Sequence, residues 1–354
     1  MNRAEQESVS IIVPCRNEEA HVDLFIASLL RQELDGIDSE VLIADGISDD
    51  GTREKLAKWA NQHPWMRVID NPERIVSTGL NRAIRESRGE YILRMDLHTE
   101  YAPDYVRRCL EVLKETGADN AGGPALTRSE SLVGRAIAAA YHSWFACGGA
   151  RFHDADYEGP ADTVPYGCWH RSVFERIGLF DEALVRNQDD EFNLRILRHG
   201  GKIWQSPKIV SWYKPRNTLR ALFRQYFQYG FWKIPVIRKH RQPASWRHLI
   251  PGSFVICVAA MPAAATLLLG TGRAELSGFV MSGWLGLVGV YGIVACMAAV
   301  AAGRSEWKIV PVLPAVFFTY HAAYGVGFLV GMLYWSFRSA QSAKPVRWFT
   351  SLSR

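Results

Sequence analysis

The pattern of hydrophobic and polar positions changes clearly along this 354-residue chain. Up to about Lys214, short apolar runs alternate with stretches whose apolar residues recur at helical spacing. The runs that predict strands are 9–14, 39–45, 66–71 and 89–96. Strands that alternate with helices in this order are typical of an α/β domain with a mostly parallel sheet.

Three of these predicted strands end in polar residues. The residues are Pro14 to Glu18 after the first strand, Asp45 at the end of the second, and Asp96 with His98 at the end of the fourth. In open α/β sheets ligands bind beyond the carboxyl ends of the strands, where the strand order reverses. We therefore expect the three segments to meet in one crevice, although each alone could be an ordinary turn or helix cap.

Asp96 and His98 are separated by one residue, so a bent strand end can present both side chains on the same side. A carboxylate and an imidazole can hold a divalent cation and leave positions open for other ligands. Oxygen suits Mg²⁺, and the imidazole favours Mn²⁺. A cation here would bridge the phosphates of a nucleotide diphosphate and neutralise its charge as it departs. The alternative is a surface turn with a chance histidine.

A second group of acidic residues, Asp189, Asp190 and Glu191, opens a stretch with helical spacing. Acidic residues at a helix amino end commonly serve the cap and the helix dipole. That explanation covers one or two of the three, so a third carboxylate could act as a general base. Arg195 and Arg198 would pair with the others.

The second part of the chain is basic and then strongly apolar. The segment between Lys214 and His248 carries many Lys and Arg residues and no acidic one, and it leads into apolar blocks, which favours anionic lipid over nucleic acid as its partner. Residues 217–236 predict an amphipathic helix at the membrane interface. Its apolar face would carry Leu219, Leu222, Phe223 and Tyr226.

Three apolar blocks follow, at 249–270, 276–303 and 309–337, and they are long enough to cross a hydrocarbon core about 30 Å thick. The positive-inside rule places the basic segment before Leu249 in the cytosol. Three full crossings would put the basic C-terminal tail outside, against the same rule, so the topology of the last block remains open. The dispersed cysteines, without a CxxC pair, fit a reducing compartment.

Four motifs resemble the inverting, family-2 glycosyltransferases of GT-A fold: VSIIVPCRNEE, VLIADGISDDGT, LNRAIRESRGEYILRMDLH and GLFDEALVRNQDDEFNLRILRHG. The resemblance covers roughly residues 8–233 and is strongest to bacterial membrane-attached transferases of the succinoglycan glucosyltransferase type. It implies a Rossmann-like GT-A catalytic domain at 1–215 and a basic interface segment at 216–248. A transmembrane region at 249–338 and a basic tail at 339–354 would follow.

The resemblance also implies how the donor is bound. The nucleotide would be UDP, with Asp45 on the uracil ring, and Mn²⁺ or Mg²⁺ would be held by Asp96 and His98 in the position of the family's DxD motif. The expected contacts to the nucleotide sugar are Pro14, Arg16, Glu18, Asp45, Arg94 and Asp96.

By the same resemblance, Asp189 stands at the position of the catalytic base, with Gln188 in place of the usual Glu before it and Asp190 as its adjacent rival. Arg195 matches the arginine that follows at fixed spacing. The residues expected to contact the acceptor are Trp169, Gln225 and Trp232.

The implied activity is inverting transfer of one sugar to a hydroxyl of a polyprenyl-diphosphate-linked saccharide, by an inner-membrane enzyme with a cytoplasmic catalytic domain. A polyprenyl-phosphate glycosyl synthase is the first alternative. A processive synthase is disfavoured because Tyr229 and Gly230 stand where its QxxRW motif requires Arg-Trp. A non-catalytic scaffold is disfavoured because Asp45, Asp96 and Asp189 are all present. The sequence leaves the donor sugar, the linkage and the oligomeric state open.

Overall fold

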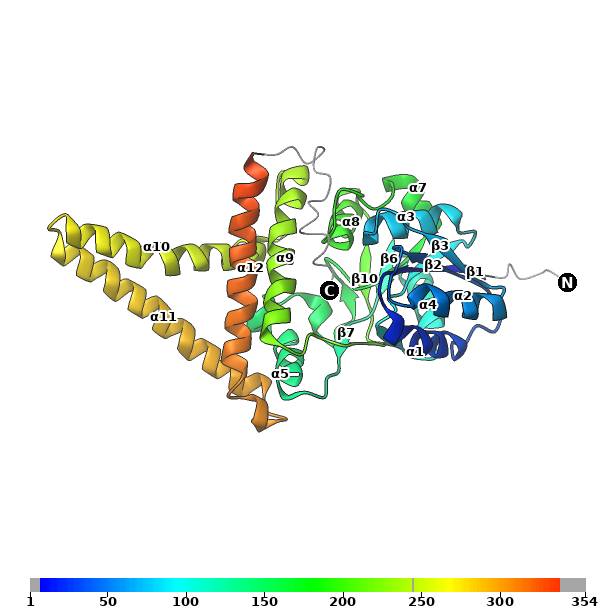
Figure 1. The fold of residues 1–354 in the computed structure, drawn as a ribbon, viewed down its shortest axis with the longest axis horizontal. Helices are drawn as coiled ribbons and strands as arrows, with labels where there is room; N and C mark the ends of the chain where they lie inside the picture. The colour runs from blue at the N-terminus through cyan, green and yellow to red at the C-terminus, as the bar shows by residue number, and fades with distance from the viewer. Residues whose placement is uncertain (1–6, 244, 338–354) are drawn as a thin grey trace. The chain divides into compact units, whose positions relative to one another are not determined.

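The computed structural model describes residues 7–243 and 245–337, which form two compact units (Figure 1). Among the described residues, the first unit comprises 7–128 and 150–214. The second comprises 129–149 and the chain from 215 onward. Arg338 and the C-terminal tail lie outside the described residues.

The first unit is built on an eight-stranded sheet with the order β3-β2-β1-β4-β9-β6-β10-β8. Strands β1 to β4 are parallel, whereas β9 runs antiparallel to both β4 and β6. The bounds are β1 Glu7–Cys15, β2 Ile37–Asp45, β3 Met66–Asp70, β4 Tyr91–Arg94, β6 Asn120–Gly122, β8 Gly159–Pro160, β9 Cys168–His170 and β10 Ile203–Gln205. The four strands expected from the sequence are therefore present, in a sheet that is mixed on its other side.

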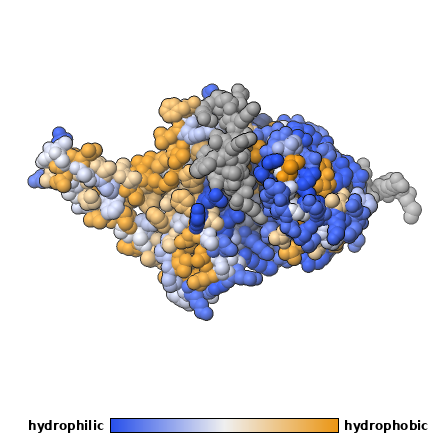
Figure 2. Space-filling view, in the orientation of Figure 1, coloured by the Kyte–Doolittle hydropathy of each residue, from blue (hydrophilic) through white to orange (hydrophobic). Residues whose placement is uncertain are grey.

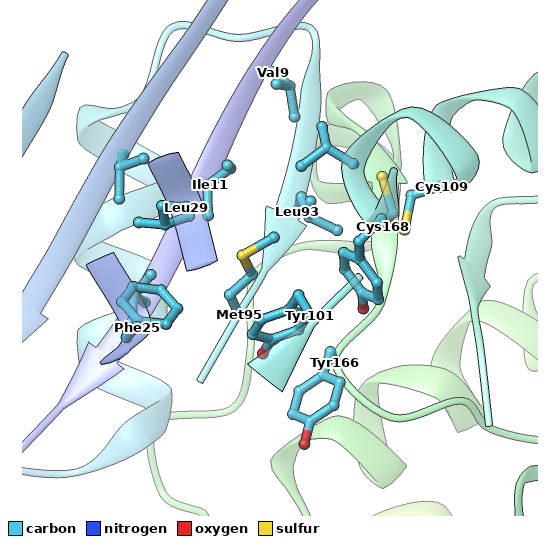
Figure 3. Close-up of a cluster of buried hydrophobic side chains, with 14 of the residues drawn as sticks. Val9, Ile11, Phe25, Leu29, Leu93, Met95, Tyr101, Cys109, Tyr166 and Cys168 are labelled. Atoms are coloured by element: carbon cyan, nitrogen blue, oxygen red, sulfur yellow. The ribbon is translucent and has the colours of Figure 1, made fainter. Parts of the chain in front are cut away.

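Helices cover both faces of this sheet because side chains alternate along the buried strands. In β1, Val9, Ile11 and Val13 join the core under α1 (Glu19–Leu30), α2 (Thr52–Gln62) and α4 (Tyr105–Thr116), part of which is drawn in Figure 3. Ile12 joins the opposite core. The helices of that face are α3 Val76–Glu86, α7 Arg171–Ile177 and α8 Gln188–Arg198. The chain thus has the Rossmann-like α/β fold expected from its sequence.

A small second sheet, of order β5-β11-β7, completes the first unit. Its strands are β5 Thr99–Tyr101, β7 Ala125–Thr127 and β11 Ser211–Tyr213. Because β5 begins five residues after β4 ends, the segment that carries Asp96 and His98 is a short link between the two sheets.

The second unit is helical. Its elements are α5 Leu132–Tyr141, α6 Trp144–Cys147, α9 Leu219–His240, α10 Ile250–Gly270, α11 Ala274–Ala302 and α12 Leu313–Ser336. Three helices, Trp246–Gly270, Ala274–Ala302 and Leu313–Ser336, are long and apolar enough to cross a membrane. Hydrophobic residues gather over them, whereas the surface of the first unit is largely hydrophilic (Figure 2).

Helix α9 packs along α12 at very short range. A Cβ added at Gly327 would lie 2.0 Å from the carbonyl oxygen of Phe227, so only glycine allows this approach. Leu222 and Tyr226 lie in the apolar cluster that α9 shares with α12, while Phe223 is 40% exposed. The expected helix is thus present, but Phe223 does not lie with the other three on its buried face.

Residues 129–149 also belong to this unit, although the sequence pattern grouped them with the catalytic domain. Ile137 of α5 is buried in the same cluster as Leu222 and Phe317. In α6, the carbonyl oxygen of Phe145 accepts a hydrogen bond from Nε2 of His321, whose Nδ1 accepts one from the Tyr291 hydroxyl. One imidazole therefore joins α6, α11 and α12.

Candidate functional site

The loops that follow β1 and β2 are locked together by backbone and side-chain hydrogen bonds. The amide of Gly46 donates to the carbonyl of Cys15 at 2.7 Å, and the amide of Glu18 donates to the Thr52 hydroxyl at 2.8 Å. Asn17, in the left-handed region at φ 54°, exchanges two hydrogen bonds with Asp49. The first loop is consequently fixed by the second, and the side chain of Glu18 is buried.

Asp45 is fully buried at the end of β2. Its Oδ2 accepts from the Ser48 amide at 3.1 Å and from Nη1 of Arg53 at 2.7 Å, while Oδ1 accepts from the Ser48 hydroxyl. Arg53 also pairs with Asp70, at the end of β3. Asp45 thus orders the loop and joins β2 to α2, and its contact to a nucleotide base stays a prediction. Arg53 was missed in the sequence because no local pattern marks it.

Arg94, the last residue of β4, brings two distant acidic side chains to one point. Its Nε and Nη2 donate to Oδ1 and Oδ2 of Asp96 at 3.0 and 3.1 Å. Its Nη1 lies 3.9 Å from Oδ2 of Asp189, at the start of α8. The carboxylates of Asp96 and Asp189, predicted from separate motifs, therefore lie on either side of one guanidinium.

The Arg94 side chain is buried, and its Nη1 has no hydrogen-bond partner in the described part of the chain. Burial alone would lower the pKa of Arg94, but the attraction of the Asp96 and Asp189 carboxylates outweighs it and raises that pKa above its usual value. The guanidinium therefore carries a full positive charge inside the protein, and its Nη1 has no acceptor among residues 7–243 and 245–337.

Hydrogen bonds to two other segments fix the backbone at Arg94 and at Asp96. The Arg94 amide donates to the carbonyl of Gly167 at 3.0 Å, and the Asp96 amide donates to the Tyr101 hydroxyl at 2.7 Å. Before Gly167, Tyr166 is in the left-handed region at φ 61°, and its hydroxyl is 2.8 Å from that of Thr99. Burial raises the pKa of Tyr166, so this hydroxyl stays protonated. The left-handed conformation of Tyr166 costs backbone energy, which the hydrogen bonds around this turn must offset.

His98 follows Asp96 in the link between β4 and β5. Its Nδ1 is 3.5 Å from Oε1 of Glu18, and its ring packs edge-on against those of His21 and Tyr213. The loop after β1 therefore contacts the segment after β4 through Glu18 and His98, and their contact to a nucleotide sugar or a cation stays a prediction.

These residues fit a divalent cation that shares its ligands with a diphosphate. A carboxylate and an imidazole are donors that Mg²⁺ and Mn²⁺ accept, and the side chains of Asp96 and His98 are 15% and 25% exposed. Within the described ranges no cluster of three or more His, Cys, Asp and Glu side chains is placed to hold a metal ion. A cation at Asp96 and His98 would therefore take its remaining ligands from substrate or water.

The acidic residues at the amino end of α8 differ in their exposure and in their partners. Asn187 precedes the helix in the left-handed conformation, at φ 61°. Asp189 is 42% exposed, and its Oδ1 accepts from the amide of Asp190 at 2.9 Å. Glu191 is fully buried and forms a two-pronged ion pair with Arg195. Glu191 is thus structural, and Asp189 is the carboxylate that lies beside Arg94.

Arg195 anchors the chain before α8. Besides Glu191, it donates to the carbonyl oxygens of Ile177 and Leu179, each at 2.7 Å. It is 13% exposed, and its interactions explain an arginine at this fixed spacing without any contact to a substrate.

The three residues expected to contact the acceptor have other surroundings. Trp169, in β9, is 2% exposed and packs edge-on against Phe174 and Phe192, so it belongs to the core. Trp232 is equally buried, and its ring lies tilted against that of Trp335, at 5.5 Å between centroids, within the second unit. Gln225 donates to the Tyr229 hydroxyl at 3.0 Å and accepts from Arg216. Trp169 therefore packs in the core, and the contacts of Trp169, Gln225 and Trp232 to an acceptor stay predictions.

The donor contacts expected in the first loop lie where the sequence placed them. Pro14 and Arg16 are partly exposed at the end of β1, and the stem of Arg16 lies against Gly46. A Cβ at Gly46 would come within 3.2 Å of that stem, so the glycine lets the two loops approach. Their contact to a nucleotide stays a prediction.

Comparison with known proteins places these features in a family. Residues 10–178 match the model described as Glycosyl transferase family 2. The chain is 32% identical over 296 residues to Succinoglycan biosynthesis protein ExoA of Rhizobium meliloti (strain 1021), covering 82% of this chain and 89% of that protein.

A second relative is more distant. The chain is 27% identical over 254 residues to Dolichyl N-acetyl-alpha-D-glucosaminyl phosphate 3-beta-D-2,3-diacetamido-2,3-dideoxy-beta-D-glucuronosyltransferase of Methanococcus voltae, covering 70% of this chain and 78% of that protein. Among solved structures, the mannosyltransferase PcManGT from Pyrobaculum calidifontis, in complex with GDP-Man and Mn²⁺, matches with a TM-score of 0.55. The match covers 92% of this chain and 88% of the other at 17% identity, and thus supports the fold.

Proposed function

The chain belongs to glycosyl transferase family 2, and we propose from this membership that it adds one sugar to a lipid-linked saccharide. The donor is a nucleotide sugar, with UDP as the nucleotide. The acceptor is a hydroxyl of a saccharide carried on polyprenyl diphosphate, and the anomeric centre is inverted. The observation that carries the proposal is the placement of Asp96 and Asp189 on one guanidinium.

In this proposal Asp189 is the general base. Its Oδ1 accepts a hydrogen bond from the amide of Asp190, and the carboxylate is 42% exposed, so an incoming hydroxyl can reach it. As the acceptor oxygen forms its bond to the anomeric carbon, the bond from that carbon to the phosphate oxygen breaks, and the hydroxyl proton passes to Asp189. Attack opposite the leaving group inverts the centre.

Asp96 and His98 would hold the divalent cation, Mn²⁺ or Mg²⁺. Such a cation supplies positive charge that stabilises the departing nucleoside diphosphate. The first loop, with Arg16 and Glu18, is locked by the loop after β2 and orders the edge of the sheet where the nucleotide binds. The solved mannosyltransferase carries GDP-Man and Mn²⁺, which supports a divalent cation and makes GDP-sugars the first alternative donors to test.

The acceptor assignment is supported by the relatives and by the helices of the second unit. The Methanococcus voltae protein is named for a dolichyl sugar phosphate, and the Rhizobium meliloti protein for succinoglycan biosynthesis. Three apolar helices associate the chain with a membrane, where a lipid-linked saccharide resides. In this proposal the enzyme resides in the inner membrane. By the positive-inside rule, the basic residues before Leu249 lie on the cytosolic side of that membrane.

The experiment uses membranes that contain the full chain. Radiolabelled UDP-sugars and GDP-sugars are supplied with Mn²⁺ or Mg²⁺, and the acceptor is either a short polyprenyl-diphosphate saccharide or bare polyprenyl phosphate. We expect the saccharide to gain one residue in β-linkage from an α-linked donor. Labelling of bare polyprenyl phosphate alone would instead identify a polyprenyl-phosphate glycosyl synthase. A ladder of longer products would identify a processive enzyme.

A further inference from the structure

The Arg94 guanidinium uses two of its three nitrogens in hydrogen bonds to Asp96, and the third has no hydrogen-bond partner among the described residues. Nε and Nη2 take both oxygens of Asp96, at 3.0 and 3.1 Å. Nη1 is buried, has no hydrogen-bond partner among the described residues, and lies 3.9 Å from Oδ2 of Asp189. In the described part of the chain, Asp96 and Asp189 are the acidic side chains within ion-pair distance of this group.

A buried guanidinium must keep a counterion. Arginine stays protonated in proteins, and a buried charge without a partner is strongly destabilising. The oxygens of Asp96 that Arg94 occupies are the same oxygens that a cation would use. Two positive groups on one carboxylate repel each other, so a cation at Asp96 weakens the hold of Arg94 on it.

Asp189 is the partner that remains. Its Oδ2 needs to approach Nη1 by only about 1 Å to reach the length of a charge-assisted hydrogen bond. Such a movement satisfies the N–H group that now has no acceptor and restores a counterion to Arg94. The geometry thus offers two alternative partners to one buried cationic side chain.

We propose that Arg94 is a positioning residue that exchanges partners: it pairs with Asp96 in the absence of a cation and with Asp189 once a cation occupies Asp96. The exchange fixes the Asp189 carboxylate only after the donor and its cation are in place. The role given to Asp189 rests on the proposed function above. The sequence assigned Arg94 to direct donor contact, and the two assignments predict different results.

The test measures binding of Mn²⁺ alone, by electron paramagnetic resonance of free Mn²⁺, to the full chain purified in detergent. Arg94→Gln removes the positive charge that competes with the cation for the oxygens of Asp96, so we expect Mn²⁺ to bind about tenfold more tightly. Arg94→Lys keeps the positive charge, so its affinity for Mn²⁺ should be close to that of the unaltered protein. Arg108→Gln, on the surface of α4 where it pairs with Asp104 and Glu111, is the matched control and should change nothing.

A second variant tests the exchange without altering Arg94. Asp189→Asn removes the alternative partner, so a cation at Asp96 leaves the guanidinium without a counterion. We expect Mn²⁺ to bind several-fold more weakly to Asp189→Asn, although Asp189 is not a metal ligand in the proposal. This measurement keeps the idea testable if Arg94→Gln fails to fold, which thermal unfolding would reveal.

Kinetics separate positioning from donor contact. With Arg94→Gln we expect kcat to fall while KM for the donor does not rise, and Arg94→Lys should restore part of kcat. A raised KM with normal kcat would mean that Arg94 contacts the donor and would overturn the proposal. So would unchanged or weaker Mn²⁺ binding by folded Arg94→Gln, or unchanged binding by Asp189→Asn. If no sugar is transferred from any donor, the proposed function fails, and the Mn²⁺ measurements still decide the role of Arg94.

Discussion

Replacement of Asp189 by asparagine tests whether this residue is the general base of the proposed reaction. Asparagine has the same shape as aspartate, and its Oδ1 can still accept the hydrogen bond from the Asp190 amide. It cannot take up a proton from an acceptor hydroxyl. The change therefore removes basicity and charge at one position and leaves the amino end of α8 in place.

The effect on folding should be small. Asp189 is 42% exposed, and its Oδ2 is 3.9 Å from Arg94, an ion pair worth less than about 1 kcal/mol at such exposure. The effect on turnover should be large, because a positioned general base contributes roughly 100-fold to 10,000-fold. That range corresponds to about 3 to 5 kcal/mol of the activation barrier. Loss of folded protein therefore cannot account for a decrease of this size.

The assay compares single-turnover transfer from the radiolabelled donor to a lipid-linked saccharide, at saturating Mn²⁺, for the unaltered chain and Asp189→Asn. UDP binding, measured by calorimetry at the same Mn²⁺ concentration, should persist. Asp190→Asn is the matched control, because the two carboxylates are adjacent and only Asp189 lies within ion-pair distance of Arg94. If Asp189→Asn turns over at a near-normal rate while Asp190→Asn is inactive, the two residues have been assigned the wrong way round.

Two further predictions concern the supports of the site and of the membrane unit. Glu191→Gln removes the buried carboxylate that neutralises Arg195, so the free energy of unfolding should fall by about 3 kcal/mol, read from chemical denaturation; an unchanged midpoint would contradict the structural role of this pair. Gly327→Ala would place a Cβ 2.0 Å from the Phe227 carbonyl and should cost about 1 to 3 kcal/mol by forcing α9 from α12. Gly289→Ala, whose Cβ meets nothing within 4 Å, is its control, and equal melting temperatures in detergent would refute the close packing.

Much of the fold of the first unit could be predicted because its longer strands carry a readable period. Val9, Ile11 and Val13 face one core and Ile12 the other, which is the alternation of a strand buried on both faces. Strand β9 could not be predicted, because its three residues, Cys168–His170, are too few to show any period. Its antiparallel pairing with β4 and β6 depends on long-range contacts that no local pattern contains.

Some contacts of the candidate site could also be predicted from the sequence, and others could not. Asp96 follows Arg94 by two residues, which is the spacing that puts side chains on one side of an extended chain, so their pairing could have been read from the sequence although β4 ends at Arg94. That Asp189 joins them depends on how α8 packs on the sheet. Likewise, α5 shows an apolar face in the sequence, but nothing local indicates that Ile137 packs with the helices near the C-terminus. Local patterns identify which face is buried and leave the partner undetermined.

Trp169 shows how an experiment can separate a packing role from a contact to the acceptor. Its indole lies in β9 against Phe174, Phe180 and Phe192, and Phe192 belongs to α8, whose first turn carries Asp189. Truncation of Trp169 would leave a cavity under α8 and displace the proposed base, so activity would fall as it would for a lost acceptor contact. Only an acceptor contact would leave the free energy of unfolding unchanged. Because the structure buries Trp169 in the core, we expect stability and activity to fall together, and activity alone would identify the wrong role.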